Sequence, residues 1–190
     1  MTDLALRPAT PEDADLLARV VDMAGEGLAR VIWAEMGGPD VDAWEIGRQR
    51  VRRDTGSFSW RNACVAERDG RALGAIVTYI IEADPEPLGS DLPAMFRPLL
   101  ELEALAPATR YINAVAVLPE ARRQGVAQAL MQTALRAPGP AGLSLITTDT
   151  NAAARALYDA LGFAETARRP IVPGRWRTPA RDWVLMTRAP

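Results

Sequence analysis

The chain has 190 residues, of which 48% are hydrophobic and 24% charged, and its formal net charge is −2. This balance is typical of a soluble globular protein, and we expect one domain over residues 1–190. No basic stripe with interleaved aromatic residues is present, so nucleic acid is not an expected partner. The apolar runs are shorter than the roughly 20 residues of a membrane helix and no signal peptide is visible, which predicts a cytoplasmic protein without a membrane partner.

Two residue types are missing altogether. The sequence contains no histidine, and all 22 basic residues are arginine. Histidine bases, Ser-His-Asp triads, Schiff-base lysines and histidine-rich metal sites are therefore excluded, and we expect no metal. The single cysteine, Cys64, excludes an internal disulfide and is interpreted as a small buried apolar residue. Any proton transfer must use carboxylates, tyrosine, cysteine or water.

The first part of the chain predicts a strand and two helices. We expect the strand over residues 4–8 and a helix over residues 10–32, which begins with Thr10 as cap and which Gly25 and Gly27 could split. A second helix is expected over residues 41–53. Its arginine-rich outer face is interpreted as solvated surface.

Asp69-Gly70 is the strongest hairpin signal in the sequence, and it predicts antiparallel strands over residues 58–67 and 71–81. Four aromatic residues precede these strands or enter them. They could line an amphipathic pocket, although aromatic residues at such spacing more often belong to the core. These residues are Trp33, Trp44, Phe58 and Trp60.

An irregular insertion follows over residues 82–108, with a short helix expected over residues 96–105. A segment of this length between strands is more typical of a binding loop or lid than of a bare connection. We therefore expect it to determine substrate specificity.

The stretch from Tyr111 to Leu130 predicts a buried strand, a turn and a helix. Pro119 stops the strand, and the helix is expected to begin near Gln124 or Gly125. The first amides of a helix have no partner within it, and together with the helix dipole they favour an anion. Gly125 and Ala127 leave room for a phosphate, while Arg122 and Arg123 add positive charge. The pattern indicates an anion cradle.

The last third of the chain predicts three more strands and one helix. The strands are expected over residues 143–148, from Phe163 onward and over 183–187, and the helix over residues 151–161 with Gly162 as its C-terminal cap. A variable loop rich in proline, glycine and arginine is expected over residues 169–181.

Two motifs together carry a family resemblance. Arg122-x-x-Gly125-x-Ala127 follows a hydrophobic strand, and Asn151-x-x-Ala-x-x-Leu-Tyr158-x-x-x-Gly162-Phe follows further on. Both resemble signatures of the GNAT family of N-acetyltransferases. The resemblance implies a single-domain GNAT fold of the mixed α/β class. Its central sheet is expected to be mixed, mostly antiparallel and twisted, with about seven strands and with helices on both faces.

The resemblance also implies a reaction. A primary amine attacks acetyl-CoA directly through a tetrahedral intermediate, and Tyr158 acts as the general acid that protonates the leaving thiolate. Asn151 either caps its helix or bonds the pantetheine arm, and both readings stay open. Arg123 stands where many relatives have glycine. The implied coenzyme A contacts are Val115, Ala116, Val117, Arg122, Arg123, Gln124, Gly125, Val126, Ala127, Gln128, Asn151 and Tyr158.

The general base is where the sequence departs from the family. The two positions at which relatives carry a carboxylate are occupied by Asn113 and Ile146, neither of which accepts an amine proton. Loop and lid carboxylates remain as candidates, and among them we favour Glu103. The other candidates are Asp54, Glu82, Asp84 and Glu101.

Three functional readings follow. The first is an N-acetyltransferase that acts on a small-molecule amine, since no separate docking segment for a protein substrate is visible. The second is an acyl-CoA-binding GNAT module that has lost catalysis. The third is a protein that binds a partner through residues 82–108. A homodimer is the default expectation for the family. The sequence does not specify the acceptor or the acyl-chain preference.

Overall fold

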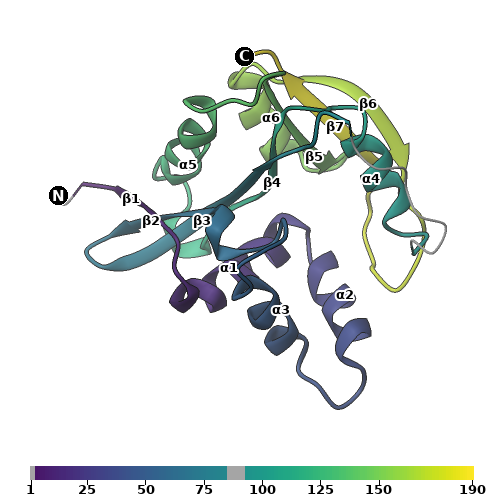
Figure 1. Cartoon of the computed structure of the whole chain (residues 1–190), viewed down its shortest axis with the longest axis horizontal. Coiled ribbons are helices and arrows are strands. Elements are labelled where there is room, and N and C mark those ends of the chain that lie inside the picture. Colours follow the sequence, from purple (N-terminus) through teal and green to yellow (C-terminus); the bar gives the residue numbers. More distant parts are fainter. Residues whose placement is uncertain (1–2, 85–92) are drawn as a thin grey trace. The chain divides into compact units, whose positions relative to one another are not determined.

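The computed structural model describes residues 3–84 and 93–190 (Figure 1). The described chain groups into two compact units. The strands hydrogen-bond in the order β1-β2-β3-β4-β5-β7-β6, and β4 and β5 form a parallel pair in this otherwise mostly antiparallel sheet. This arrangement confirms the expected fold class. The first unit holds the chain up to Thr78 together with Asn113–Thr133, and the second holds Tyr79–Ile112 and Ala134–Pro190.

The first unit begins with three helices, where two were expected. These are α1 (Ala14–Ala24), α2 (Leu28–Gly37) and α3 (Ala43–Val51). The long helix predicted over residues 10–32 is split where the glycines lie, because Gly27 adopts a left-handed backbone with φ of 89°. The buried Asp22 then helps to begin α2, since its Oδ1 accepts a hydrogen bond of 2.9 Å from the Arg30 amide.

Three antiparallel strands of the first unit are β1 (Ala5–Pro8), β2 (Ala63–Arg68) and β3 (Arg71–Ile80). The predicted hairpin is confirmed, because Asp69 and Gly70 both have positive φ, at 54° and 72°, as a two-residue type I′ turn requires. Arg7 joins β1 to its surroundings with ion pairs of 2.8 Å to Asp13 and to Glu67. The pair with Arg7 holds the pKa of the Asp13 carboxyl below its usual range.

The strand predicted from residue 58 begins only at Ala63, so the prediction for residues 58–62 is wrong. Trp60–Asn62 forms a 3-10 turn instead. The Ser59 hydroxyl donates to Arg53 O at 2.6 Å and accepts from the Arg61 amide at 3.2 Å. Such bonds between side chain and backbone compete with a strand ladder, and the alternation of apolar residues does not reveal them.

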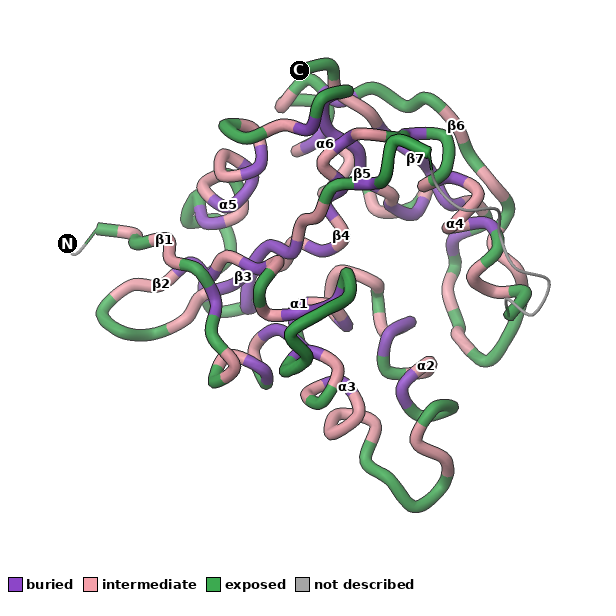
Figure 2. The backbone as a smooth tube through the Cα atoms, in the orientation of Figure 1, coloured by how far each residue is buried: buried purple, intermediate pink, exposed green. Residues whose placement is uncertain are grey.

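The apolar core of the first unit lies between these helices and strands (Figure 2). Trp33 and Phe58 are only 2% and 9% exposed, and their rings stack at 5.9 Å. They therefore serve the core rather than a pocket. Gly47 permits this packing, because a Cβ built on it would lie 2.7 Å from the Trp33 ring.

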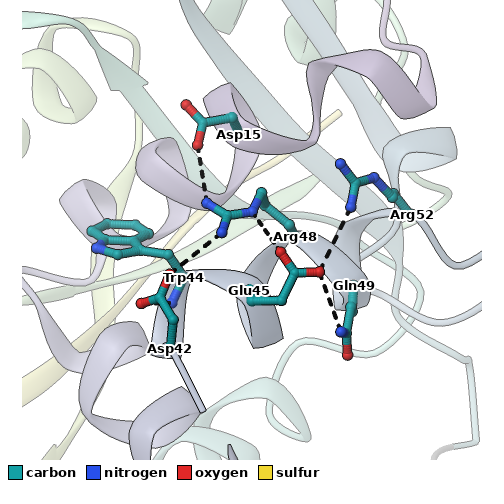
Figure 3. Close-up of polar contacts among 7 residues, drawn as sticks. All are labelled: Asp15, Asp42, Trp44, Glu45, Arg48, Gln49 and Arg52. Atoms are coloured by element: carbon teal, nitrogen blue, oxygen red, sulfur yellow. Dashed lines mark hydrogen bonds and ion pairs between the residues drawn. The ribbon is translucent and has the colours of Figure 1, made fainter.

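The arginine-rich face of α3 is a network of surface ion pairs (Figure 3). The Arg48 guanidinium contacts Glu45 at 3.0 Å on its own helix, and it reaches Asp15 of α1 and Asp42 at 3.4 Å each. Asp42 also caps α3 by accepting from the Trp44 amide. Since exposed ion pairs each contribute about 0–1 kcal/mol, the apolar core rather than this network provides most of the stability of the unit.

The remainder of the first unit is the end of β4 (Arg110–Val117) and most of α5 (Val126–Leu135). Within this unit α5 lies on the side of the strands opposite α1 to α3 (Figure 1). The expectation of helices on both faces is met here.

The second unit contains α4, α6 and three more strands. The β6–β7 pair is antiparallel from Ala164↔Thr187 to Pro170↔Asp182, so β6 continues through Pro170 and the loop that was expected over residues 169–181 covers residues 171–181. The insertion predicted over residues 82–108 lies partly outside the described residues, at 85–92. The elements are α4 (Arg97–Glu103), β5 (Leu143–Thr148), α6 (Ala152–Ala160), β6 (Ala164–Pro170) and β7 (Asp182–Arg188).

Replacing Gly47 with alanine tests the packing of α3 against Trp33. Overpacking a core costs about 1–3 kcal/mol, and alanine recovers about 1 kcal/mol of helix propensity. We expect the free energy of unfolding to fall by about 1–2 kcal/mol, measured by urea denaturation. Gly174→Ala is the control, because a Cβ there meets nothing within 4 Å. Equal stability of the two variants would contradict the role assigned to Gly47.

Candidate active site

The first part of the candidate site is the turn between β4 and α5. After Val117, residues Pro119–Ala121 form a 3-10 turn, and α5 begins at Val126, slightly later than predicted. The Ala129 amide donates to Gly125 O at 3.0 Å, which makes Gly125 the cap. The amides of Val126, Ala127 and Gln128 therefore occupy the first turn, where a helix offers them no acceptor.

The backbone of this turn is left-handed at two positions. Gly125 has φ of 79° with open space around it, and Arg123 has φ of 60°. Arg123, which stands where many relatives have glycine, thus adopts the left-handed backbone conformation that glycine takes at no steric cost. Its guanidinium is carried on an exposed position of the turn.

Side chains hold the turn in place. Arg122 Nε donates to Val117 O at 3.3 Å. Gln124 accepts from Arg68 of β2 at 2.8 Å and donates to Glu120 O at 3.2 Å. The turn that was expected to form the cradle is braced, and it combines two arginines with amides at a helix start, which suits phosphate oxygens. Binding of an anion there stays a prediction.

The end of β4 supplies the backbone that was expected to contact pantetheine. The parallel register with β5 runs from Arg110↔Leu143 to Ile112↔Leu145, whereas β4 itself continues to Val117. Val115 and Ala116 are half-buried and Val117 is buried. Their contact with a ligand stays a prediction.

Asn151 and Tyr158 belong to α6 in the second unit. Asn151 Oδ1 accepts from the Ala154 amide at 3.3 Å and so caps the helix, which agrees with one of its two predicted roles. Tyr158 is 8% exposed, and burial raises its pKa to about 12. At neutral pH its phenol is protonated and able to donate, as a general acid must be.

Glu103 is the carboxylate with the most perturbed environment among the candidate bases. It is the last residue of α4, and burial raises its pKa to about 7. A hydrogen bond from the Tyr79 hydroxyl to Glu103 Oε2 acts in the opposite direction and lowers the pKa. This bond is long, at 3.3 Å. A carboxylate with a pKa near 7 is suited to general-base catalysis at neutral pH.

The other candidate bases are placed differently. Asp54 pairs with Arg61 at 2.8 Å and Glu101 with Arg169 at 3.2 Å, both at the surface. Glu82 and Asp84 are exposed. Of the two positions at which relatives carry a carboxylate, Asn113 is half-buried on β4 and Ile146 faces Leu185 in the β5–β7 pair.

Tyr111 is the centre of a group of ionisable side chains in the second unit, because the charges of Glu103, Tyr79 and Tyr158 all act on it. The Tyr79 and Tyr111 rings meet edge to face at 5.4 Å. Tyr111 is buried, and its pKa is raised well above the usual value, first by desolvation and then by the charges of Glu103, Tyr79 and Tyr158. Sequence reasoning missed Tyr79 and Tyr111, and the scarcity of tyrosine was the signal that could have found them.

Three further observations concern metal ligands, helix length and the single cysteine. No group of three or more cysteine or acidic residues able to hold a metal ion occurs within residues 3–84 and 93–190. Over the same part of the chain, no helix combines the length and apolar character needed to cross a membrane. The half-buried Cys64 thiol has a pKa raised by burial, which keeps it protonated.

Comparison with known proteins identifies the family. A model described as the acetyltransferase (GNAT) family matches residues 26–163, which is most of the chain. The chain therefore belongs to the GNAT family of acetyltransferases. No curated protein sequence matches it significantly.

Solved structures share the fold at low sequence identity. An N-acetyltransferase from Staphylococcus aureus Mu50 matches with a TM-score of 0.64 and 17% identity over 96% of this chain and 98% of its own. A putative phosphinothricin N-acetyltransferase matches with a TM-score of 0.57 and 22% identity over 98% of each chain. A chain from the NatC complex bound to Gag peptide and CoA matches with a TM-score of 0.54 and 16% identity over 98% of each.

Tyr79→Phe tests whether Tyr79 stabilises the Glu103 carboxylate. Removing the donor removes the one interaction that lowers the Glu103 pKa, so we expect this pKa to rise above 7. Carbon NMR titration of labelled glutamate side chains measures it directly. Tyr158→Phe is the control, because Tyr158 does not contribute to the shift of Glu103. An unchanged or lower Glu103 pKa in Tyr79→Phe would refute the role.

Substitutions of Asn151 separate its two predicted roles. Serine caps a helix as well as asparagine does but lacks the amide, whereas alanine does neither. We expect Asn151→Ala to lose about 1 kcal/mol of stability and Asn151→Ser to lose little. Both should weaken coenzyme A binding about three- to tenfold in calorimetric titration if the amide bonds the pantetheine. Wild-type affinity in Asn151→Ser would leave capping as the sole role.

Proposed function

We propose that the chain is an acetyl-CoA-dependent N-acetyltransferase that transfers an acetyl group to a primary amine by direct attack. Membership of the GNAT family supports acetyl transfer in general. The observation that carries the specific proposal is the pair Glu103 and Tyr158, whose surroundings move their pKa values to about 7 and about 12. Two titratable groups whose pKa values are shifted apart in this way suit the roles of a base and an acid.

The residues of the first unit fit the proposed co-substrate. The β4–α5 turn offers first-turn amides, and Arg122 and Arg123 supply positive charge for phosphates. The open space at Gly125 leaves the backbone accessible. One structural neighbour is a chain from the NatC complex bound to Gag peptide and CoA. We propose that the backbone of Val115, Ala116 and Val117 holds the pantetheine arm, beyond the point where the β5 register ends.

The proton balance assigns a role to each side chain. The amine nitrogen forms a bond to the acetyl carbonyl carbon, and the carbon–sulfur bond breaks as the tetrahedral intermediate collapses. A Glu103 carboxylate oxygen takes the proton that the amine loses, directly or through water. The Tyr158 hydroxyl gives a proton to the departing thiolate, and the overall transfer then consumes no net proton. The amide of Val117 is proposed to stabilise the oxyanion.

We propose a small-molecule amine as the acceptor. The neighbours include a putative phosphinothricin N-acetyltransferase, and also a complex bound to Gag peptide. A catalytically inactive acyl-CoA-binding module is the second candidate, because Asn113 and Ile146 occupy the family's base positions. A partner-binding protein that uses residues 82–108 is the third.

Titration of acetyl-CoA, with thiol release followed across a panel of primary amines, separates these readings. The proposal expects binding and turnover. Binding without turnover on any amine supports the inactive module, and absence of coenzyme A binding contradicts both acyl-CoA readings and leaves the partner-binding protein.

Glu103→Gln and Tyr158→Phe test the acid–base pair. We expect each to lower kcat by about 10²-fold or more, the usual contribution of such groups. Wild-type kcat/KM should rise with pH through about 7, because Glu103 must lose its proton to act as base, and Glu103→Gln should lose this rise. Glu101→Gln is the matched control on the same helix. A wild-type pH profile in Glu103→Gln would exclude Glu103 as the base.

A further inference from the structure

The loop over residues 171–181, between β6 and β7, encloses a hollow of about 360 Å³ that the proposed reaction does not use. Its wall combines apolar side chains with cationic ones. Ile171, Val172 and Trp176 provide the apolar part, and Arg177 and Arg181 the cationic part. No acidic residue lines it in the described chain.

Several contacts shape this loop. Its ends are tied by a hydrogen bond of 2.8 Å from the Ile171 amide to Arg181 O. The Arg181 amide also donates to Asp149 Oδ1 at 3.1 Å, which joins the loop to the end of β5. Trp176 stacks on Trp183 of β7, with the ring centroids 5.4 Å apart and the planes within 6°. The hollow is therefore formed by a supported loop.

Charge is unevenly distributed along this part of the chain. Residues 171–181 contain three arginines and no carboxylate, although the whole chain carries a net charge of −2. Just before the loop, Arg168 pairs with Glu165 and Asp182. By contrast, Arg177 and Arg181 are exposed, and no ion pair of either is found in the part of the chain that the structure describes. The Asp149 carboxylate contacts Arg181 through the backbone amide and makes no ion pair with its guanidinium among the described residues.

We propose that this loop is an anion-binding site that takes a carboxylate or phosphate group of the amine acceptor. A guanidinium binds either group with charge-assisted hydrogen bonds, and the apolar wall suits the carbon skeleton beside it. The ion pair between Arg169 on β6 and Glu101 connects the start of the loop to α4, the helix that ends at Glu103. The assignment to the acceptor rests on the proposed function, whereas anion binding does not.

Benzoate tests the site without any turnover, and benzamide is its neutral counterpart of similar shape. We expect benzoate to shift the NMR signals of the Arg177 and Arg181 Nε–H groups, and benzamide to leave them in place. The double variant Arg177→Gln/Arg181→Gln should weaken benzoate binding at least about tenfold. Arg136→Gln, an exposed arginine just after α5, is the control and should bind benzoate as the wild type does.

Matched acceptors test the link to catalysis. For pairs of an amino acid and the amine that lacks its carboxylate, the double variant should raise KM for the acid and leave KM for the amine unchanged. Competition between benzoate and coenzyme A would assign the arginines to the coenzyme's phosphates and overturn the acceptor assignment. Equal binding of benzoate and benzamide, or unchanged benzoate binding in the double variant, would overturn the anion site. Benzoate binding without any acetyl transfer would contradict the proposed function alone.

Discussion

The hydrogen-bond ladder of β4 constrains most of what the chain can do. Its first residues pair with β5 in parallel register, and the Arg110 amide donates to Gly142 O. Its last residues belong to the other unit, where the Leu118 amide beyond the strand donates to Leu73 O. Because Pro119 follows at once, the strand stops at a fixed point and the chain turns into α5. The position of the cradle relative to β4 is thus a consequence of backbone bonding rather than of any side chain in it.

Burial of one carboxylate compensates for the missing histidine. A protein without imidazole has no side chain that ordinarily titrates near pH 7. Desolvation raises the pKa of Glu103 to about 7 and that of the Tyr158 phenol, which is protonated at neutral pH, to about 12. Tyr111 is also buried, but no role in proton transfer is proposed for it. Low polarity in the second unit therefore separates the pKa values of the proposed base and the proposed acid.

Local signals in the sequence predicted the local parts of this structure. Asp69-Gly70 predicted the hairpin, and Gly25 and Gly27 marked the split between α1 and α2. Gly27 and Gly70 adopt positive φ, which glycine does at no steric cost. The strand expected from residue 58 failed, since a serine hydroxyl bonded to the backbone outweighs an apolar pattern. The fold class followed from the family resemblance that two motifs carry.

The surroundings of Glu103 were beyond sequence reasoning. Its partner Tyr79 lies near the end of β3, Tyr111 lies on β4, and Glu103 is the last residue of α4. Contacts among them therefore depend on tertiary packing. Glu103 was favoured as a base, yet nothing in its neighbours along the chain indicated a raised pKa. The hollow in the loop over residues 171–181 also depends on contacts far along the chain, such as that between Arg181 and Asp149.

The ion-pair network of Arg48 has a consequence for the chemistry of the protein surface. A planar guanidinium with five donors can join three carboxylates at once, as Arg48 does across α1 and α3. Every cationic side chain of the chain is of this type. Guanidinium groups stay protonated and are poor nucleophiles at neutral pH, whereas a lysine amine would compete for an activated acetyl group. A transferase built in this way has no lysine side chain of its own to acetylate.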